Sequence, residues 1–275
     1  MDQAQAPPLD PIPSQPEETA PRRLGWWVHL VVLTAFPILI GVMSIGRSAH
    51  AEPALTHSVR GLLITSLLQM GVFAVFFGVA WLGSKASGKE LLLPWRRGCW
   101  PVLQGVAYSF LLRFALAVLA VMVAAILVLS QAIKLEDLQR FSQINRPDVG
   151  ALVDISALRQ NPVYFWLTLT LVSFVVAGLR EELWRSALLA GLRRIWPWQF
   201  GSRGGQFLGV SLAAVVFGAG HVAQGPMGMV VAGLLGLGLG IIMVIHDSIW
   251  PAVIAHGMFD ATTFALLPAL AKYLQ

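Results

Sequence analysis

Residues 162–190 read PVYFWLTLTLVSFVVAGLREELWRSALLA, an apolar run that ends in a cluster of charged residues. Residues 162–179 contain no charged side chain, and a transmembrane helix needs about 20 mainly apolar residues. The stretch therefore predicts a membrane-spanning helix that carries Arg180, Glu181, Glu182 and Arg185. A charge near the bilayer centre costs about 2.5–3.5 kcal/mol on insertion scales. Charges of that cost usually face the interior of a helix bundle and mark a pathway, a proton relay or a catalytic centre.

The whole chain has the composition of a membrane protein. Of its 275 residues, 56% are hydrophobic and 12% are charged, whereas soluble domains carry about 25% charged residues. We therefore predict an all-α polytopic membrane protein, a bundle of about seven to eight transmembrane helices with a buried polar site. The predicted spans are 25–46, 61–83, 102–131, 162–190, a short Gly-rich stretch at 206–222, 227–245 and 249–270.

The order of these spans predicts three regions. Residues 1–24 are rich in Pro, Gln and acidic residues and are predicted to form a disordered cytoplasmic tail. Residues 25–160 are predicted to hold the N-terminal transmembrane helices and a connecting loop, and 161–270 the catalytic core. The longest connection, 132–161, is predicted to contain a short interfacial helix or to cover a substrate opening.

The basic residues and tryptophans indicate how the chain lies in the membrane. The net charge of +5 comes mostly from Lys and Arg in short loops beside spans, which the positive-inside rule explains. We therefore expect membrane lipids as partners and no nucleic acid. The bias in Lys and Arg favours a cytoplasmic N-terminus. We expect the protein to lie in the inner membrane of a bacterial cell. Several tryptophans lie at span ends, as in an interfacial aromatic belt: Trp26, Trp27, Trp81, Trp100, Trp196, Trp198 and Trp250.

Two further spans each carry ionisable residues. His221 follows a Gly-rich run, and His256 and Asp260 are four residues apart, on one helical face. Glu181 and Glu182 can both reach Arg185, at spacings of four and three, so one carboxylate is expected to be left over as a general base. Taken singly, each group could equally be a residue that packs in the helix bundle or one half of a helix-stabilising polar pair. Three such groups in three spans predict one shared site.

The three motifs, in this order, resemble the CPBP family, which includes type II CAAX prenyl proteases and bacteriocin-processing or self-immunity proteins. The family pattern is a Glu pair followed by Arg, then Phe-x-x-x-His, here Phe217 to His221, then His-x-x-x-Asn. The resemblance covers about 160–270. Two departures stand out: two residues, rather than the usual three, separate the Glu pair from Arg185, and Asp260 replaces the common Asn. An ionised Asp only accepts hydrogen bonds, whereas Asn also donates them.

The resemblance implies an intramembrane peptidase, glutamate- or metal-dependent, that acts on a membrane-associated protein or peptide, either prenylated or unmodified. Glu181, favoured as the lead carboxylate, deprotonates a water with help from His221, and His256, with or without Asp260, stabilises the oxyanion. Glu182 and Arg185 hold the helix, and Phe217 supports the site. Glu181, His221 and His256 are also a candidate zinc set. Because the chain has no His-Glu-x-x-His motif, a metal-free mechanism is favoured over zinc.

Other functions are compatible with the same residues. A non-catalytic scaffold or immunity protein of the same family would explain the short Glu-to-Arg spacing. A proton-coupled transporter would explain buried charges, although no internal repeat is evident in the sequence. Cys99 lies in a basic turn with no His near it in the sequence, which disfavours a thiol nucleophile. Arg113 is a fourth intramembrane charge, and either a carboxylate or a lipid headgroup could be its partner.

Overall fold

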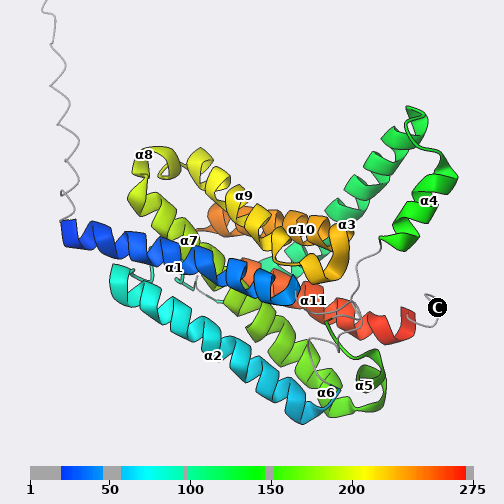
Figure 1. Cartoon of the computed structure of the whole chain (residues 1–275), viewed down its shortest axis with the longest axis horizontal. Helices are drawn as coiled ribbons and strands as arrows, with labels where there is room; N and C mark the ends of the chain where they lie inside the picture. The colour runs from blue at the N-terminus through cyan, green and yellow to red at the C-terminus, as the bar shows by residue number, and fades with distance from the viewer. Residues whose placement is uncertain (1–19, 46–56, 96–97, 146–151, 271–275) are drawn as a thin grey trace, which may run out of the picture.

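The computed structural model describes residues 20–45, 57–95, 98–145 and 152–270, and within these residues the chain is helical, with no β-strand (Figure 1). The elements, in chain order, are α1 (Ala20–Ile45), α2 (Val59–Ser84), α3 (Trp100–Leu129), α4 (Leu135–Ile144), α5 (Ile155–Gln160), α6 (Pro162–Leu167), the π-helix η2 (Thr168–Leu179), α7 (Arg180–Ile195), α8 (Pro197–Phe200), α9 (Arg203–Ala219), the 3₁₀ turn η3 (Val222–Gln224), α10 (Gly225–His246) and α11 (Trp250–Leu270).

Six helices in the described part of the chain are long and apolar enough to cross a membrane. Five are α1, α2, α3, α10 and α11, and the sixth is the continuous run Pro162–Ile195, formed by α6, η2 and α7. The seventh predicted stretch is α9, which has 17 residues and is shorter than a typical span. The predicted all-helical membrane fold is therefore confirmed. The stretch 162–190 changes from α to π geometry and back without ending.

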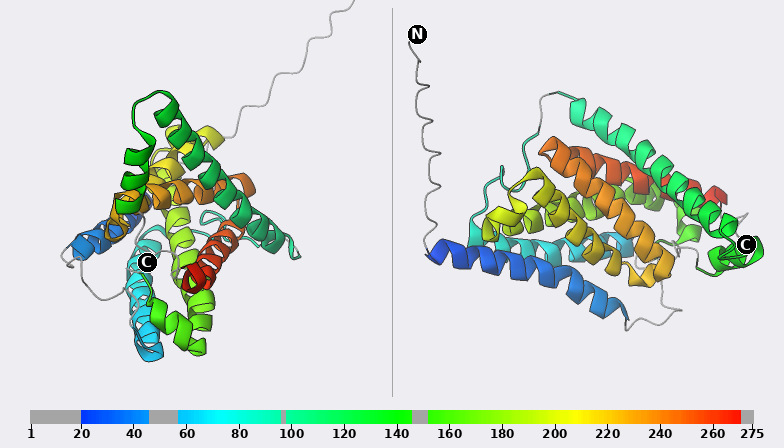
Figure 2. Two further views of the ribbon diagram at one scale, coloured as in Figure 1. Left: turned by 90° about the vertical axis from the view of Figure 1, so that its right-hand side faces the viewer. Right: turned by 90° about the horizontal axis from the view of Figure 1, so that it is seen from above.

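The long helices pack as neighbouring pairs around α7 and α11. Figures 1 and 2 show α1 beside α2 and α9 beside α10, while α11 packs between η2 and α3. The buried His29 joins three elements: its Nε2 donates to the carbonyl oxygen of Ala187 in α7 (2.9 Å), and its Nδ1 lies 2.9 Å from Ser84 Oγ in α2. These contacts fasten the N-terminal helix pair to the half of the chain that carries the candidate site.

Glycines allow α11 to approach η2 closely. A Cβ atom on Gly178 would lie 2.9 Å from the carbonyl oxygen of Val253, and a Cβ on Gly257 would overlap the Phe174 ring. Small residues permit such close helix contacts in membranes. Because Gly178 precedes Glu181 by three residues and Gly257 follows His256, this contact brings the two motifs together.

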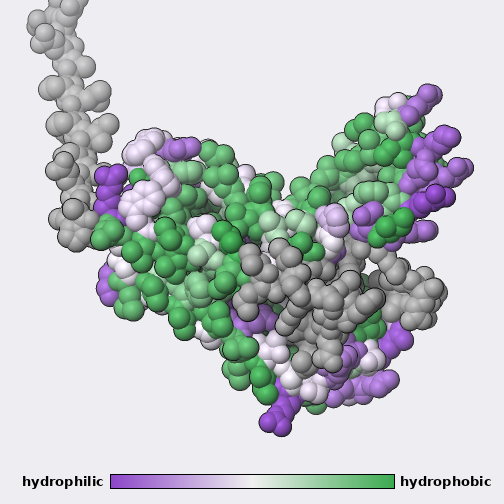
Figure 3. All heavy atoms as spheres, in the orientation of Figure 1, coloured by the Kyte–Doolittle hydropathy of each residue, from purple (hydrophilic) through white to green (hydrophobic). Residues whose placement is uncertain are grey.

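The outer surface has the polarity expected of a membrane protein. Figure 3 shows hydrophobic atoms over much of the visible face and hydrophilic atoms mostly along its margins. Large apolar side chains on α2 and α3, such as Leu67 and Phe114, are exposed. Trp27, Trp81, Trp100 and Trp198 are also exposed, as a belt requires. The prediction was wrong for Trp26, which is only 1% exposed because its ring packs against His29 in the core.

Some predicted boundaries change. Residues 20–24, predicted as part of the tail, belong to α1, and residues 1–19 lie outside the described residues. The connection 132–161 contains two short helices, α4 and α5. No side chain of α4 is buried, and its apolar residues Leu135, Phe141 and Ile144 are exposed.

Asp154 begins α5 as its N-cap. Its carboxylate accepts hydrogen bonds from the backbone N–H groups of Ser156 (2.7 Å) and Ala157 (3.1 Å), and it also contacts His57, just before α2. Desolvation alone would raise the pKa of Asp154, but the hydrogen bonds from Ser156, His57 and Ala157 outweigh it and lower the pKa from 3.8 to about 2. The ionised carboxylate therefore stabilises the folded state.

We expect this stabilisation to be present above about pH 4, where the unfolded-state carboxyl is also ionised, and to be lost as the pH falls through the folded-state pKa of about 2. Asp154→Asn keeps an N-cap acceptor but does not titrate. Unfolding titrations from pH 5 to pH 2 should show a steeper loss of stability in the wild type than in Asp154→Asn. Parallel curves would contradict the assignment.

Candidate functional site

The two glutamates take their places from the junction between η2 and α7. The π-helix ends at Leu179, and Glu181 and Glu182 lie in the first turn of α7. Segments of π-helix are rare and are often found at functional sites. On the facing helix α11, His256 and Asp260 are one turn apart. Two helices therefore present three carboxylates and an imidazole to one another.

Glu182 forms the buried centre of the site. Its side chain is 0% exposed, and it accepts hydrogen bonds from Arg185 NH1 and from His256 Nδ1, the latter at 3.1 Å. The Arg185 guanidinium is also fully buried and lies over the Phe217 ring, 4.9 Å from its centroid. A buried charge needs such partners to offset its desolvation. This arrangement fixes the orientation of the His256 ring and turns Nε2 toward the other two carboxylates.

Glu181 and Asp260 lie on either side of His256 Nε2. The distance from this nitrogen to Glu181 Oε2 is 3.7 Å, and the distance to Asp260 Oδ2 is also 3.7 Å. The Glu181 side chain is 17% exposed, so it is open to small molecules in a way that Glu182 is not. Of the two glutamates, Glu181 is thus the one placed to meet a reacting water.

The prediction that one carboxylate is left over was wrong. Glu181 Oε1 accepts a hydrogen bond from Arg180 NH2 (2.8 Å), and Arg180 NH1 donates to Gln69 Oε1 in α2 (2.8 Å). Each glutamate therefore has its own arginine. The sequence did not predict the pairing of Arg180 with Glu181, since neighbouring positions on a helix do not normally face each other. No sequence signal links Gln69 to the site.

His221 follows the end of α9, beside Phe217. Its Nδ1 donates to the carbonyl oxygen of Phe217 (2.8 Å), and the two rings are 4.5 Å apart. That hydrogen bond leaves Nε2 as the acceptor in the neutral ring. The Phe217 ring lies edge-on to His256, 6.4 Å away, and His221 interacts electrostatically with Asp260. The Phe217 ring thus lies beside both imidazoles, His221 and His256.

Arg113 links α3 to the site. Its guanidinium donates to Ser109 Oγ (2.8 Å) within α3, and to the carbonyl oxygen of Phe259 and Thr262 Oγ1 in α11. It also interacts electrostatically with Asp260. The direct partners of Arg113 are therefore hydroxyl and carbonyl oxygens, and the carboxylate of Asp260 acts on it at longer range.

We expect Arg113→Leu to lower the free energy of unfolding by about 2 kcal/mol, because α11 loses charge-assisted hydrogen bonds and Asp260 loses a nearby positive charge. Adding Asp260→Asn should recover part of the loss, since a neutral amide needs no compensating charge. Reversible unfolding in mixed detergent micelles measures both. An additive double variant would show that Arg113 does not act on Asp260.

The same site contains the predicted zinc set of Glu181, His221 and His256. Among the residues that the structure describes, no three or more His, Cys, Asp or Glu side chains are arranged to hold a metal ion. In the predicted zinc set, His221 Nδ1 donates to a backbone carbonyl and His256 Nδ1 donates to Glu182, which is the usual arrangement for the second nitrogen of a metal-bound histidine. Glu181 is engaged with Arg180 through Oε1.

Comparison with known families matches the part of the chain that forms this site. Residues 162–262 match the family model described as type II CAAX prenyl endopeptidase Rce1-like. This segment is therefore similar to the Rce1-like family. The predicted CPBP resemblance is confirmed over the Rce1-like segment, which contains Glu181, Glu182, Arg185, Phe217, His221, His256 and Asp260. No curated protein and no solved structure gives a significant match. With its apolar helices, the chain is an integral, multi-pass membrane protein.

Proposed function

We propose that the protein is an intramembrane endopeptidase that hydrolyses a peptide bond of a membrane-associated protein or peptide. The observation that carries this proposal is the single polar cluster formed by Glu181 and Glu182 of α7 with His256 and Asp260 of α11, inside a membrane-spanning, Rce1-like segment. Carboxylates beside an imidazole provide general acid–base catalysis.

Glu181 is the general base in this mechanism. It takes a proton from a water, whose oxygen attacks the carbonyl carbon of the substrate, and later returns the proton to the leaving amine when the C–N bond breaks. His221, with Nε2 available as an acceptor, assists in orienting the water. Glu182 and Arg185 keep the helices in register and do not contact substrate.

His256 provides the oxyanion contact. In its protonated form the ring donates Nδ1–H to Glu182 and directs Nε2–H into the space between Glu181 and Asp260, where it stabilises the tetrahedral oxyanion. Asp260 holds this ring nitrogen in place. Because an ionised Asp cannot donate a hydrogen bond, the oxyanion role belongs to His256 rather than to Asp260.

The test is proteolysis by the full-length protein reconstituted in lipid vesicles. Prenylated and unmodified membrane peptides are offered as a library, and cleavage is read by mass spectrometry with and without a chelator. We expect cuts by the wild type that disappear in Glu181→Gln and weaken in His221→Ala. Identical cleavage by the wild type and Glu181→Gln would refute the proposed base. No cleavage by the wild type, with library peptides still captured, would point to a non-catalytic binding role.

We also propose that the N-terminus is cytoplasmic, following the distribution of Lys and Arg beside the spans. Cys99 reports on this, because it is the only cysteine, is exposed, and precedes α3 at the end of the bundle predicted to face the cytoplasm. A membrane-impermeant maleimide should label Cys99 in inverted vesicles and not in intact cells. The reverse pattern would invert the topology.

A further inference from the structure

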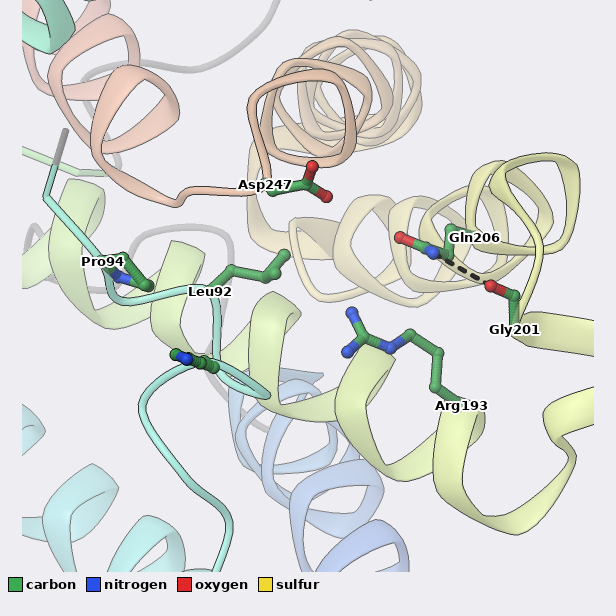
Figure 4. A pocket seen from close by; sticks show the side chains of 7 residues that line it. Leu92, Pro94, Arg193, Gly201, Gln206 and Asp247 are labelled. Atoms are coloured by element: carbon green, nitrogen blue, oxygen red, sulfur yellow. Dashed lines mark hydrogen bonds between the residues drawn. The ribbon is translucent and has the colours of Figure 1, made fainter. Parts of the chain in front are cut away.

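A second polar feature lies away from the catalytic cluster, where several long helices end. A cavity of about 430 Å³ opens between the loop after α2, the last turn of α7, the start of α9 and the end of α10 (Figure 4). Its walls are formed by Lys89, Leu92, Pro94, Arg193, Gly201, Gln206 and Asp247. None of these residues has a part in the proposed peptidase.

The charges around the cavity leave two cations without direct partners. Arg194 forms an ion pair with Glu90, and Arg203 forms one with Asp247 at 2.9 Å. Among the described residues, neither the Lys89 ammonium nor the Arg193 guanidinium has a hydrogen bond or a direct ion pair, and Glu90 and Asp247 act on Arg193 only at longer range. The cavity wall therefore carries two cationic side chains that have no direct counter-ion.

The neighbouring carboxylates form their direct ion pairs with other arginines. Desolvation works to raise the pKa of Glu90, but hydrogen bonds from Ser87 and Arg194 more than offset it and keep the pKa below its ordinary value. Glu90 is thus ionised and held by Arg194. The carboxylate of Asp247 is held in the same way by Arg203. An anion that enters the cavity meets Lys89 and Arg193 first.

The rest of the cavity wall has polar and apolar parts, as a ligand with a polar head and an apolar tail would require. Figure 4 shows the Arg193 guanidinium directed into the cavity, with Gln206 on one side and Leu92 on the other. The Gln206 amide donates to the carbonyl oxygen of Gly201, while its buried Oε1 has no partner among the described residues. The Trp95 and Trp250 rings, 5.3 Å apart, lie near the same helix ends, and tryptophans typically mark the membrane interface.

We propose that this cavity binds a phosphate-bearing anion, with Lys89 and Arg193 as its cationic ligands. A guanidinium and an ammonium are the side chains that proteins use for phosphate. The phosphate can belong to an anionic phospholipid headgroup at the membrane interface, or to a soluble phosphate ester. Binding at this site does not depend on peptidase activity.

The test is native mass spectrometry of the full-length protein in detergent, titrated with short-chain phosphatidylglycerol, short-chain phosphatidylcholine or glycerol phosphate. We expect one phosphatidylglycerol to bind more tightly than phosphatidylcholine. Each of Lys89→Gln and Arg193→Gln should weaken that binding about fivefold, the usual effect of one basic residue near an anionic lipid surface. Glycerol phosphate bound as tightly as the lipid would assign the site to soluble phosphates.

Lys85→Gln is the matched control, because Lys85 is an exposed lysine four residues before Lys89 that does not line the cavity. It should bind phosphatidylglycerol like the wild type. Lys89 is exposed in a loop, so Lys89→Gln should fold even if Arg193→Gln does not. The proposal would be overturned if the wild type and Lys89→Gln bound phosphatidylglycerol equally. It would also be overturned if the protein bound phosphatidylglycerol and phosphatidylcholine with equal affinity and did not bind glycerol phosphate.

Discussion

Glu181→Gln should lower the kcat/KM of peptide cleavage by about 10²–10⁴-fold, the range that general acid–base catalysis contributes. Glutamine keeps the size of the side chain and can still accept a hydrogen bond from Arg180, but it cannot take a proton from water. Glu181 is partly exposed and lies 3.7 Å from His256 Nε2, so the substitution leaves the buried Glu182–Arg185 pair in place. We therefore expect a folded protein with unchanged substrate capture.

The measurement is the initial rate of cleavage of the best peptide found in the library, together with the thermal unfolding of each variant. Glu136→Gln is the matched control, because it makes the same chemical change on the exposed helix α4, and its rate should equal that of the wild type. If Glu181→Gln retained the wild-type rate while Glu182→Gln remained folded and lost activity, Glu182 would be the base and the proposed roles would be exchanged.

Arg185→Leu should lower the free energy of unfolding by about 3–5 kcal/mol, the usual cost of removing one partner from a buried ion pair. Both side chains are fully buried, and without Arg185 the Glu182 carboxylate would keep only its hydrogen bond with His256. Glycines of α10 leave room for the arginine, since a Cβ atom on Gly236 would lie 3.2 Å from Arg185 NH2. A leucine in that space cannot donate a hydrogen bond to the Glu182 carboxylate or balance its charge.

Reversible unfolding in mixed micelles measures this loss. Adding Glu182→Gln to Arg185→Leu should restore part of the stability, because no unpaired charge is then buried. The exposed pair of Arg203 and Asp247 is the comparison: losing an exposed ion pair costs about 0–1 kcal/mol, so Asp247→Asn should have little effect. A similarly small loss in Arg185→Leu would show that the buried pair does not hold α7 in place.

Much of the architecture could be predicted because its cause is local. Six of the predicted apolar stretches are long enough to cross a bilayer, and in lipid the backbone must satisfy its hydrogen bonds within a helix. The charged motifs were recognisable for a related reason, since an ionisable residue in such a stretch is costly and needs a partner or a function. The grouping of His256 with the two glutamates followed from these residues and from the order of the motifs.

The pairing inside the site could not be predicted, because it depends on which helices touch. Helical spacing allowed Arg185 to contact either glutamate, and only the close approach of η2 and α11 at Gly178 and Gly257 places His256 against Glu182. Gln69, which holds Arg180, is 111 residues away in sequence.

The sequence by itself thus determined that the chain is a helical membrane protein and which spans carry its polar motifs, since hydrophobicity and helix periodicity act over neighbouring residues. The tertiary structure alone decided that Glu182 is the buried partner of Arg185, that Glu181 remains accessible, and that Lys89 and Arg193 line a separate cavity. Those outcomes depend on burial and on the distances between helices. Both are set by how the helices pack, and the local sequence does not specify them.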